Sequence, residues 1–333
     1  MTSTATTIQH AAPPSYSGPR AFVQRLRNGD EIAHLFTLTF AAAILLITSM
    51  LVWELWVNSH LSRAKFGWNF FWTQTWDPIF DNFGAAPFIY GTLVTSVVAL
   101  ALAVPLGLAS AIFLSELAPR KISDAVSFLI DLLAAVPSVI YGLLGIFVVV
   151  PLMRSWLGPL LIHTLGKLPG IGKLFAGPNY GVGFFTAGIV LAIMVVPFII
   201  SVSREVLLTV PREQREAALA LGATRWEATW KVVVPWARTG VMGSVFLALA
   251  RALGETMAVT MVIGNDPKIS ASLLHPGYTI AAVIANEFTE ATGDLYLSAL
   301  IELGLVLFLM TFILNGLARI LIVATERGGG RPA

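Results

Sequence analysis

Two charged side chains lie near the middle of an otherwise apolar run, FLALARALGETMAVTMVIG, over residues 246–264. Arg251 and Glu255 are four residues apart, a spacing that places two side chains on one face of a helix. A guanidinium offers paired N–H donors that match the oxygens of a carboxylate or a phosphate. The pair therefore predicts either a structural ion pair or a site that handles an oxyanion.

The apolar surroundings favour the second interpretation. An arginine at the centre of a membrane span costs about 2.5–3.5 kcal/mol, so both side chains must face protein or water. Arg before Glu is the weaker order for an intrahelical pair, and apolar packing often replaces a buried ion pair without loss of stability. We expect Arg251 to contact a transported oxyanion. Glu255 either holds Arg251 when the site is empty or accepts a hydrogen bond from a protonated oxyanion such as hydrogen phosphate.

The composition of the chain is that of a polytopic membrane protein. Of its 333 residues, 56% are hydrophobic and 12% are charged, and the mean hydropathy is +0.78. Soluble proteins average about 25% charged residues. The chain has no cysteine, and its five histidines show no ligand spacing, so we expect no disulfide and no metal site. A net charge of +2 gives no reason to expect nucleic-acid binding.

Six segments are apolar over about the 20 residues that a helix needs to cross a bilayer. They are residues 34–57, 87–114, 126–152, 182–203, 240–263 and 295–323. Lys and Arg are concentrated in the segments that face the cytoplasm if the N-terminus does. We therefore expect an all-α, six-span protein with both termini cytoplasmic. Pro105, Pro137 and Pro197 are expected to kink spans two, three and four.

The first span stands apart from a core at residues 87–325. Residues 1–33 and 326–333 are predicted cytoplasmic tails, the first of them disordered. Residues 58–86 form an extracytoplasmic loop whose Trp and Phe residues suit the headgroup level. Among the other charges within spans, Asp131 and Glu302 are expected to face the bundle with their polar atoms satisfied, or, for Asp131, to lie near the inner rim, rather than to contact cargo.

The segment between spans four and five, about residues 206–238, carries strong local signals. Pro211 can open a helix and Gly222 can end it. Thr224 and Glu227 then have the spacing of a capping box, and Pro235 is expected to stop or bend the second helix. The pattern predicts a helix–turn–helix at the cytoplasmic face. It is either an element on which another protein docks or an amphipathic pair of helices that lies on lipid headgroups.

The same segment resembles the EAA motif of permease subunits in binding-protein-dependent ABC importers. The matching residues are Glu216, Ala217, Ala218, Gly222, Val232, Val234 and Pro235, with valines where isoleucine and leucine are usual. The resemblance implies coupling helices that dock on an ATPase subunit and convert its closure into movement of the membrane pathway. The chain has no Walker A motif, since Leu174 follows Gly172-Lys173 where Ser or Thr is required. The resemblance thus implies a permease that is not an enzyme and binds no cofactor, with ATP and magnesium held by the ATPase.

Three further segments narrow the resemblance to the PstC family of phosphate-importer permeases. They are RALGETMAV at residues 251–259, AVPSVIYG at residues 135–142, and the PGYTI and IANEF runs within residues 276–288. The resemblance implies a type I ABC importer permease core of the MetI-like kind, in the plasma membrane of a prokaryote. It also implies three partners besides membrane lipid: a PstA-like permease subunit, an ATPase dimer and an extracytoplasmic phosphate-binding protein.

The resemblance implies that Arg251 and Glu255 take part in phosphate passage. From the matching segments we add Thr256, Ser138 and Tyr141 as candidates for the pathway, and we expect no catalytic residue. One alternative is a permease of the same class for sulfate or molybdate. A secondary phosphate carrier is a second, although it usually has internal repeats and more spans and has no use for an EAA loop.

Overall fold

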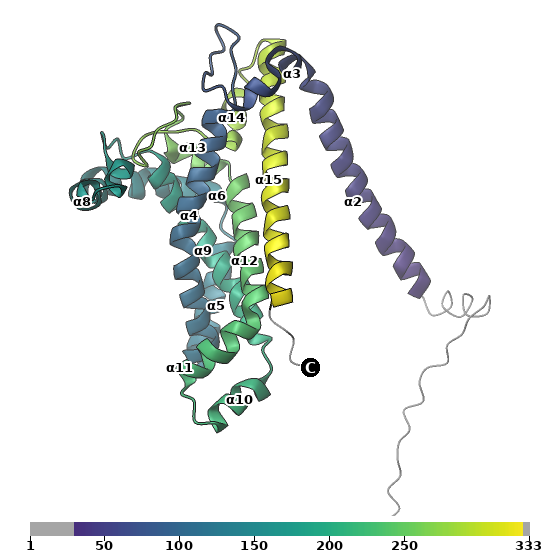
Figure 1. Cartoon of the computed structure of the whole chain (residues 1–333), viewed down its shortest axis with the longest axis vertical. Coiled ribbons are helices and arrows are strands. Elements are labelled where there is room, and N and C mark those ends of the chain that lie inside the picture. Colours follow the sequence, from purple (N-terminus) through teal and green to yellow (C-terminus); the bar gives the residue numbers. More distant parts are fainter. Residues whose placement is uncertain (1–29, 329–333) are drawn as a thin grey trace, which may run out of the picture. The chain divides into compact units, whose positions relative to one another are not determined.

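A computed structural model describes residues 30–328 of the chain, and side chains over residues 33–324 (Figure 1). The helices are α2 (Asp30–Asn58), α3 (His60–Phe66), α4 (Ala86–Ile112), α5 (Arg120–Ala134), α6 (Ser138–Leu144), α7 (Val150–Leu152), α8 (Gly158–Thr164), α9 (Phe184–Leu208), α10 (Arg212–Ala220), α11 (Arg225–Ala228), α12 (Val234–Gly254), α13 (Met257–Ile263), α14 (Ile280–Glu287) and α15 (Asp294–Gly328). Over the described residues, β-pairing is limited to two isolated bridges. The predicted all-α class is confirmed. The tails predicted at residues 1–33 and 326–333 lie almost wholly outside the described residues.

The chain divides into two compact units, residues 1–54 and residues 55–333. The first contains most of α2, and the candidate membrane span Ala33–Asn58 begins within it. The side chains of α2 from residue 33 onward are nearly all exposed, as expected of a helix that is not packed within a core. The second unit holds the remaining helices and every site discussed below.

Six helical segments of the described chain are long and apolar enough to cross a membrane, which confirms the predicted number. Their bounds are Ala33–Asn58, Ala86–Leu117, Ser138–Lys167, Phe184–Leu208, Arg225–Gly254 and Asp294–Ala324. Pro105 and Pro197 lie inside α4 and α9, as the sequence indicated.

Two spans differ from the predicted bounds: the fifth covers Arg225–Gly254 instead of residues 240–263, and the third is broken. A single helix was predicted over residues 126–152, but α5 ends at Ala134 and α6 begins at Ser138. Pro137 has ψ 140° and stands as the N-cap of α6. Proline has no N–H for the helix ladder and pushes the preceding residue toward extended conformations, so the helix breaks here instead of kinking.

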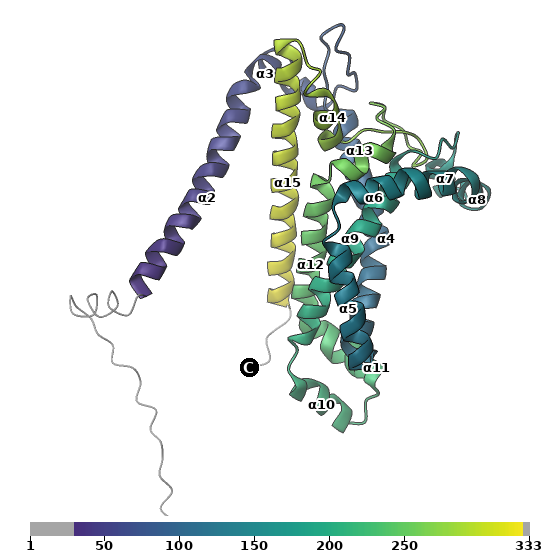
Figure 2. The ribbon, with the colours of Figure 1, turned by 180° about the vertical axis from the view of Figure 1, so that it is seen from behind.

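The break changes the direction of the chain. Within the second unit, α5 lies beside α9 and α6 packs against α13, whereas the chain from α7 to α8 leads away from the bundle (Figures 1 and 2). Gly142 allows α6 to approach α13 closely. A Cβ at this position would lie 2.4 Å from the Met261 sulfur and 3.2 Å from the Ala258 Cα.

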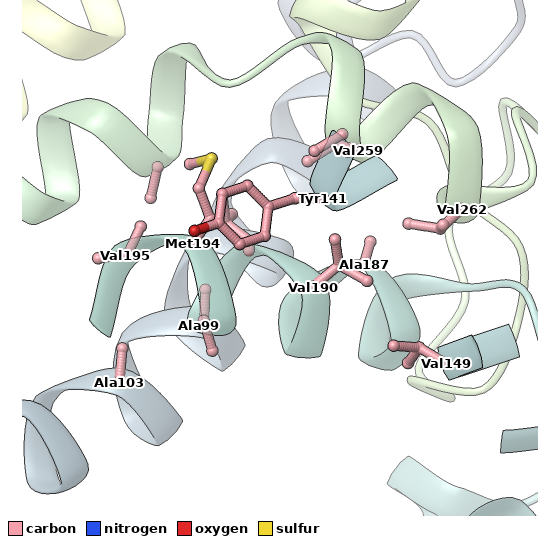
Figure 3. Close-up of a cluster of buried hydrophobic side chains, with 14 of the residues drawn as sticks. Ala99, Ala103, Tyr141, Val149, Ala187, Val190, Met194, Val195, Val259 and Val262 are labelled. Carbon is pink, nitrogen blue, oxygen red and sulfur yellow. The ribbon is translucent and has the colours of Figure 1, made fainter. Parts of the chain in front are cut away.

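The largest core cluster lies where α4, α6, α9 and α13 meet (Figure 3). Its members combine small side chains such as Ala99 with larger ones, including Tyr141, Val190, Met194 and Val259. Small residues let helices in a membrane approach closely and pack by van der Waals contact. This packing fixes α6 and α13 against α9, and so positions the polar residues that the two short helices carry.

A second core cluster closes the end of the bundle opposite α10 (Figure 1). Two aromatic residues packed against this cluster donate hydrogen bonds to the Glu287 carboxylate, Trp76 Nε1 at 2.8 Å and Tyr296 Oη at 2.6 Å. Burial raises the pKa of the nearby Tyr278 phenol well above its usual range, so this group stays neutral. The segment at residues 58–86 is therefore a folded cap whose Phe residues are partly core, rather than only an interfacial belt.

Candidate functional site

The apolar run that carries the two central charges is not one helix. α12 ends at Gly254, Glu255 takes an extended conformation (φ −70°, ψ 127°), and α13 begins at Met257. Glycine weakens a helix interior by about 1 kcal/mol relative to alanine. The Glu255 carboxylate then accepts a hydrogen bond from the Ala258 N–H at 3.2 Å, which satisfies one of the free donors at the start of α13.

The break overturns the geometry expected for Arg251 and Glu255. Four-residue spacing brings two side chains together only on a continuous helix. Among the described residues no ion pair joins these two, and Glu255 instead caps α13. The interpretation of Glu255 as the resting partner of Arg251 is not supported by this conformation.

Arg251 has an exposed side chain on α12, within the apolar segment Arg225–Gly254 that is long enough to cross a membrane. Its Cζ lies 5.8 Å from the centroid of the Phe198 ring on α9, within the range of a cation–π contact. Its charge also acts electrostatically on the Tyr141 hydroxyl of α6. Within the part of the chain that the structure describes, no carboxylate lies at ion-pair distance from it. An uncompensated guanidinium at this depth must face another polypeptide or water, not lipid.

The other predicted pathway residues differ in burial and in the hydrogen bonds that they make. Tyr141 is 7% exposed, and its hydroxyl donates to the Leu133 carbonyl at 2.7 Å. This bond ties α6 back to α5 across the break, so Tyr141 positions the site instead of offering a free donor to cargo. Ser138 lies half-buried in the first turn of α6, and Thr256 lies in the gap between α12 and α13, where its hydroxyl donates to the Gly254 carbonyl at 3.3 Å.

The structure adds Phe198 to the predicted residues around Arg251. It follows Pro197 in the apolar run of α9. Nothing in its local sequence distinguishes it from its neighbours, because its role depends on the approach of α9 to α12.

The predicted helix–turn–helix is confirmed as α10 and α11. Gly222 has φ +88°, the left-handed conformation that ends α10. In the capping box, the Glu227 N–H donates to Thr224 Oγ1 at 3.2 Å, and the Thr224 N–H donates to Glu227 Oε2 at 2.9 Å.

Pro235 does not stop the second helix, which was one of the two effects predicted for it. The chain stays helical from Arg225 to Gly254, with one wider π-helical stretch at Thr229–Val233 before Pro235 enters the first turn of α12. Proline is tolerated there because a local π-helical adjustment of the backbone accommodates its missing N–H. One helical segment therefore connects the second half of the EAA loop to Arg251.

The EAA residues face outward on α10. Glu216 and Ala217 are exposed and Ala218 is half-buried, while Leu221 at the tip is 90% exposed. A small charged helix that ends in a large exposed apolar side chain is suited to dock into a complementary groove.

Arg215 fixes α10 to two membrane helices. Its Nε donates to Glu116 Oε2 at 3.0 Å and its Nη2 to Glu116 Oε1 at 2.8 Å, a bidentate pair in which the Glu116 side chain is 8% exposed. The guanidinium also donates to the carbonyls of Leu207, at 2.8 Å, and Val210. One side chain thus joins α10 to the end of α4 and to the end of α9. Glu116 was not among the predicted residues, because it is 99 residues away from Arg215 in the chain.

Comparison with known proteins identifies the class. Residues 103–326 match the family described as the binding-protein-dependent transport system inner membrane component. The chain belongs to this family, and it is accordingly a multi-pass membrane permease rather than a member of a catalytic enzyme family.

Curated relatives share one name. The chain is 45% identical over 323 residues to a phosphate transport system permease protein PstC of Mesorhizobium japonicum, covering 97% of this chain and 99% of the relative. It is 48% identical over 292 residues to the protein of that name from Pasteurella multocida, covering 88% and 91%.

Solved structures share the fold at low sequence identity. A chain of a bacterial alginate ABC transporter in complex with an alginate pentasaccharide-bound periplasmic protein aligns with a TM-score of 0.56 and 17% identity. The alignment covers 90% of this chain and 96% of that chain. A chain of the MetNI methionine ABC transporter in an inward-facing conformation aligns with a TM-score of 0.52 and 17% identity, over 72% and 94%. The predicted ABC importer permease fold is confirmed.

Proposed function

We propose that this chain is the phosphate-conducting permease subunit of an ATP-driven importer. It would work with a homologous PstA-like permease subunit, a cytoplasmic ATPase dimer that binds ATP and magnesium, and an extracytoplasmic phosphate-binding protein. The observation that carries this proposal is the uncompensated guanidinium of Arg251 on a helix that continues into the EAA loop. The names of the relatives support phosphate as the cargo.

Arg251 provides the anion contact. Its fork of donors matches two phosphate oxygens, and Phe198 holds it beside α9. Its exposed face in the isolated chain is where the partner permease would complete the pathway. Because the site lies away from bulk water in that assembly, each donor contributes more than it does at a surface.

Glu255 provides discrimination between oxyanions. One of its carboxylate oxygens caps α13, and the other is left to accept a hydrogen bond. Hydrogen phosphate carries an O–H that can donate to it, whereas sulfate at neutral pH has none. Thr256 and Ser138 would line the same passage at the ends of α13 and α6.

The coupling path runs through α10 and α11 to α12. Movement of a docked ATPase subunit would act on the exposed Glu216–Ala218 face and on Leu221. The helical continuity from Arg225 to Gly254 would carry that movement to Arg251. In this proposal the EAA loop and both termini are cytoplasmic, in agreement with the distribution of Lys and Arg.

Uptake of labelled phosphate into proteoliposomes that contain the whole complex tests the proposal. Uptake should require ATP, the ATPase and the binding protein, and a tenfold excess of sulfate or molybdate should leave it unchanged. Glu255→Gln should weaken the preference for phosphate over sulfate about tenfold, the loss of about one charge-assisted hydrogen bond. Phosphate uptake without any ATPase would contradict the importer reading, and discrimination unchanged in Glu255→Gln would contradict the role of that carboxylate.

A further inference from the structure

One carboxylate in the apolar interior is only partly paired within the described residues. Glu302 on α15 is 3% exposed, and its Oε2 is buried without a hydrogen bond to any described residue. The expectation that Glu302 is satisfied within the bundle is therefore wrong. The Ser62 hydroxyl interacts with this carboxylate and the charge of Arg63 acts on it, but one hydroxyl supplies one donor at most, whereas an ionised carboxylate has about four acceptor sites. A buried unpaired carboxylate is costly, so a partner from outside the chain is indicated.

A cavity of about 310 Å³ opens beside Glu302. Leu305, Val306 and Leu309 form one wall, because residues three, four and seven positions after Glu302 lie on the same face of α15. Trp68 and Phe71, from the segment that follows α3, also line the cavity. The cavity is therefore lined mainly by apolar side chains, and Glu302 is one of two charged residues in its lining.

Arg63 of α3 is the second charge that lines this cavity. Its guanidinium stacks on the Trp56 ring, with Cζ 3.6 Å from the centroid, and Nε donates to Ser59 Oγ at 3.0 Å. It also donates to the Trp56 carbonyl. An arginine has five N–H donors, so others remain for an anionic group. No ion pair joins Arg63 to Glu302 in the described chain, and the two charges thus stand apart in one apolar cavity.

The position of the cavity along the bundle fits the headgroup region of a bilayer. α3 and the start of α15 lie at the end of the second unit opposite α10 (Figures 1 and 2). With a rise of about 1.5 Å per residue, Glu302 is about 12 Å along α15 from Asp294. Tryptophans such as Trp56 and Trp68, which are 51% and 83% exposed, are typical of this depth.

We propose that this cavity binds one phospholipid whose headgroup carries a primary ammonium. The ammonium donates to the Glu302 carboxylate, the phosphate accepts from Arg63, and an acyl chain lies along Leu305 and Leu309. A quaternary ammonium has no N–H to donate, and a glycerol headgroup has no positive charge. The site therefore selects phosphatidylethanolamine over phosphatidylcholine and phosphatidylglycerol.

Native mass spectrometry of the complete transporter tests this site. The purified complex is exchanged into detergent with equal amounts of palmitoyl-oleoyl phosphatidylethanolamine, phosphatidylcholine and phosphatidylglycerol. The wild type should retain phosphatidylethanolamine with about a tenfold preference, and Glu302→Gln should lose it, since a charge-assisted hydrogen bond is replaced by a neutral one. Glu290→Gln, at an exposed carboxylate on the same side of the chain, is the matched control and should keep the preference.

A second variant separates the site from effects on folding. Leu305→Trp keeps Glu302 and fills the cavity, so it should lose the bound lipid while the complex stays assembled. Equal retention of the three lipids by the wild type, or an unchanged preference in Glu302→Gln or Leu305→Trp, would overturn the proposal.

Discussion

Arg251→Ala is expected to lower ATP-driven phosphate uptake by about 100-fold. The substitution removes two charge-assisted hydrogen bonds to the anion, each contributing about 1.5–3 kcal/mol, and 1.4 kcal/mol corresponds to a factor of ten. Because Arg251 is exposed in the isolated chain and pairs with no described carboxylate, its loss should leave the fold intact. The measurement is initial uptake of labelled phosphate by proteoliposomes, with assembly checked by co-purification of the subunits.

Two companion variants make the result specific. Arg251→Lys keeps the charge but not the planar fork, so it should recover only part of the uptake. Arg154→Ala, at an exposed arginine in the segment that leads away from the bundle, should transport as the wild type does. Wild-type uptake by an assembled Arg251→Ala complex would show that Arg251 is not the contact for the anion.

Breaking the Arg215–Glu116 pair is expected to uncouple ATP hydrolysis from transport. Both groups are largely buried, and removal of one partner of such a pair costs about 3–5 kcal/mol. In Glu116→Ala, α10 loses its connection to α4, so the phosphate imported per ATP hydrolysed should fall about tenfold while hydrolysis continues. The double variant Glu116→Arg with Arg215→Glu should recover part of that ratio. It restores the ion pair, but a glutamate cannot donate to the Leu207 and Val210 carbonyls.

A surface pair provides the control for this experiment. Lys231 and Glu227 lie 3.6 Å apart with side chains 75% and 44% exposed, and such pairs contribute about 0–1 kcal/mol. Lys231→Ala should leave the coupling ratio unchanged. If Glu116→Ala transports with a normal ratio, or if the double variant is no better than either single one, Arg215 is not the connection that we describe.

The features predicted correctly from sequence depend on short stretches of chain. Apolar length alone marks the spans, and the capping box of Thr224 and Glu227 lies within four residues. The EAA pattern likewise repeats a known spacing over one segment. Such signals can be recognised from the sequence alone because the interacting residues are close together in the chain.

The features that were missed depend on how helices meet. Arg251 and Glu255 have the spacing of a helical pair, and only the cap that Glu255 forms on α13 shows that the helix is broken between them. Pro137 and Pro235 look alike in an apolar sequence, yet one breaks a helix and the other enters its first turn. Glu116 and Glu302 could not be assigned roles, because their environments are built from residues far away in the sequence.

The central claim is that the face of α12 that carries Arg251 lines a pathway whose access alternates with the state of the ATPase. This chain has no cysteine, so Leu247→Cys, one helical turn before Arg251 and 55% exposed, places a single thiol of this chain on that face. Its reaction with a membrane-impermeant maleimide, added to one side of the reconstituted complex at a time, is the direct measurement. If access alternates, the thiol should be labelled from one side without nucleotide and from the opposite side with ATP and vanadate. Labelling that ignores nucleotide, or that never occurs from either side, would contradict it.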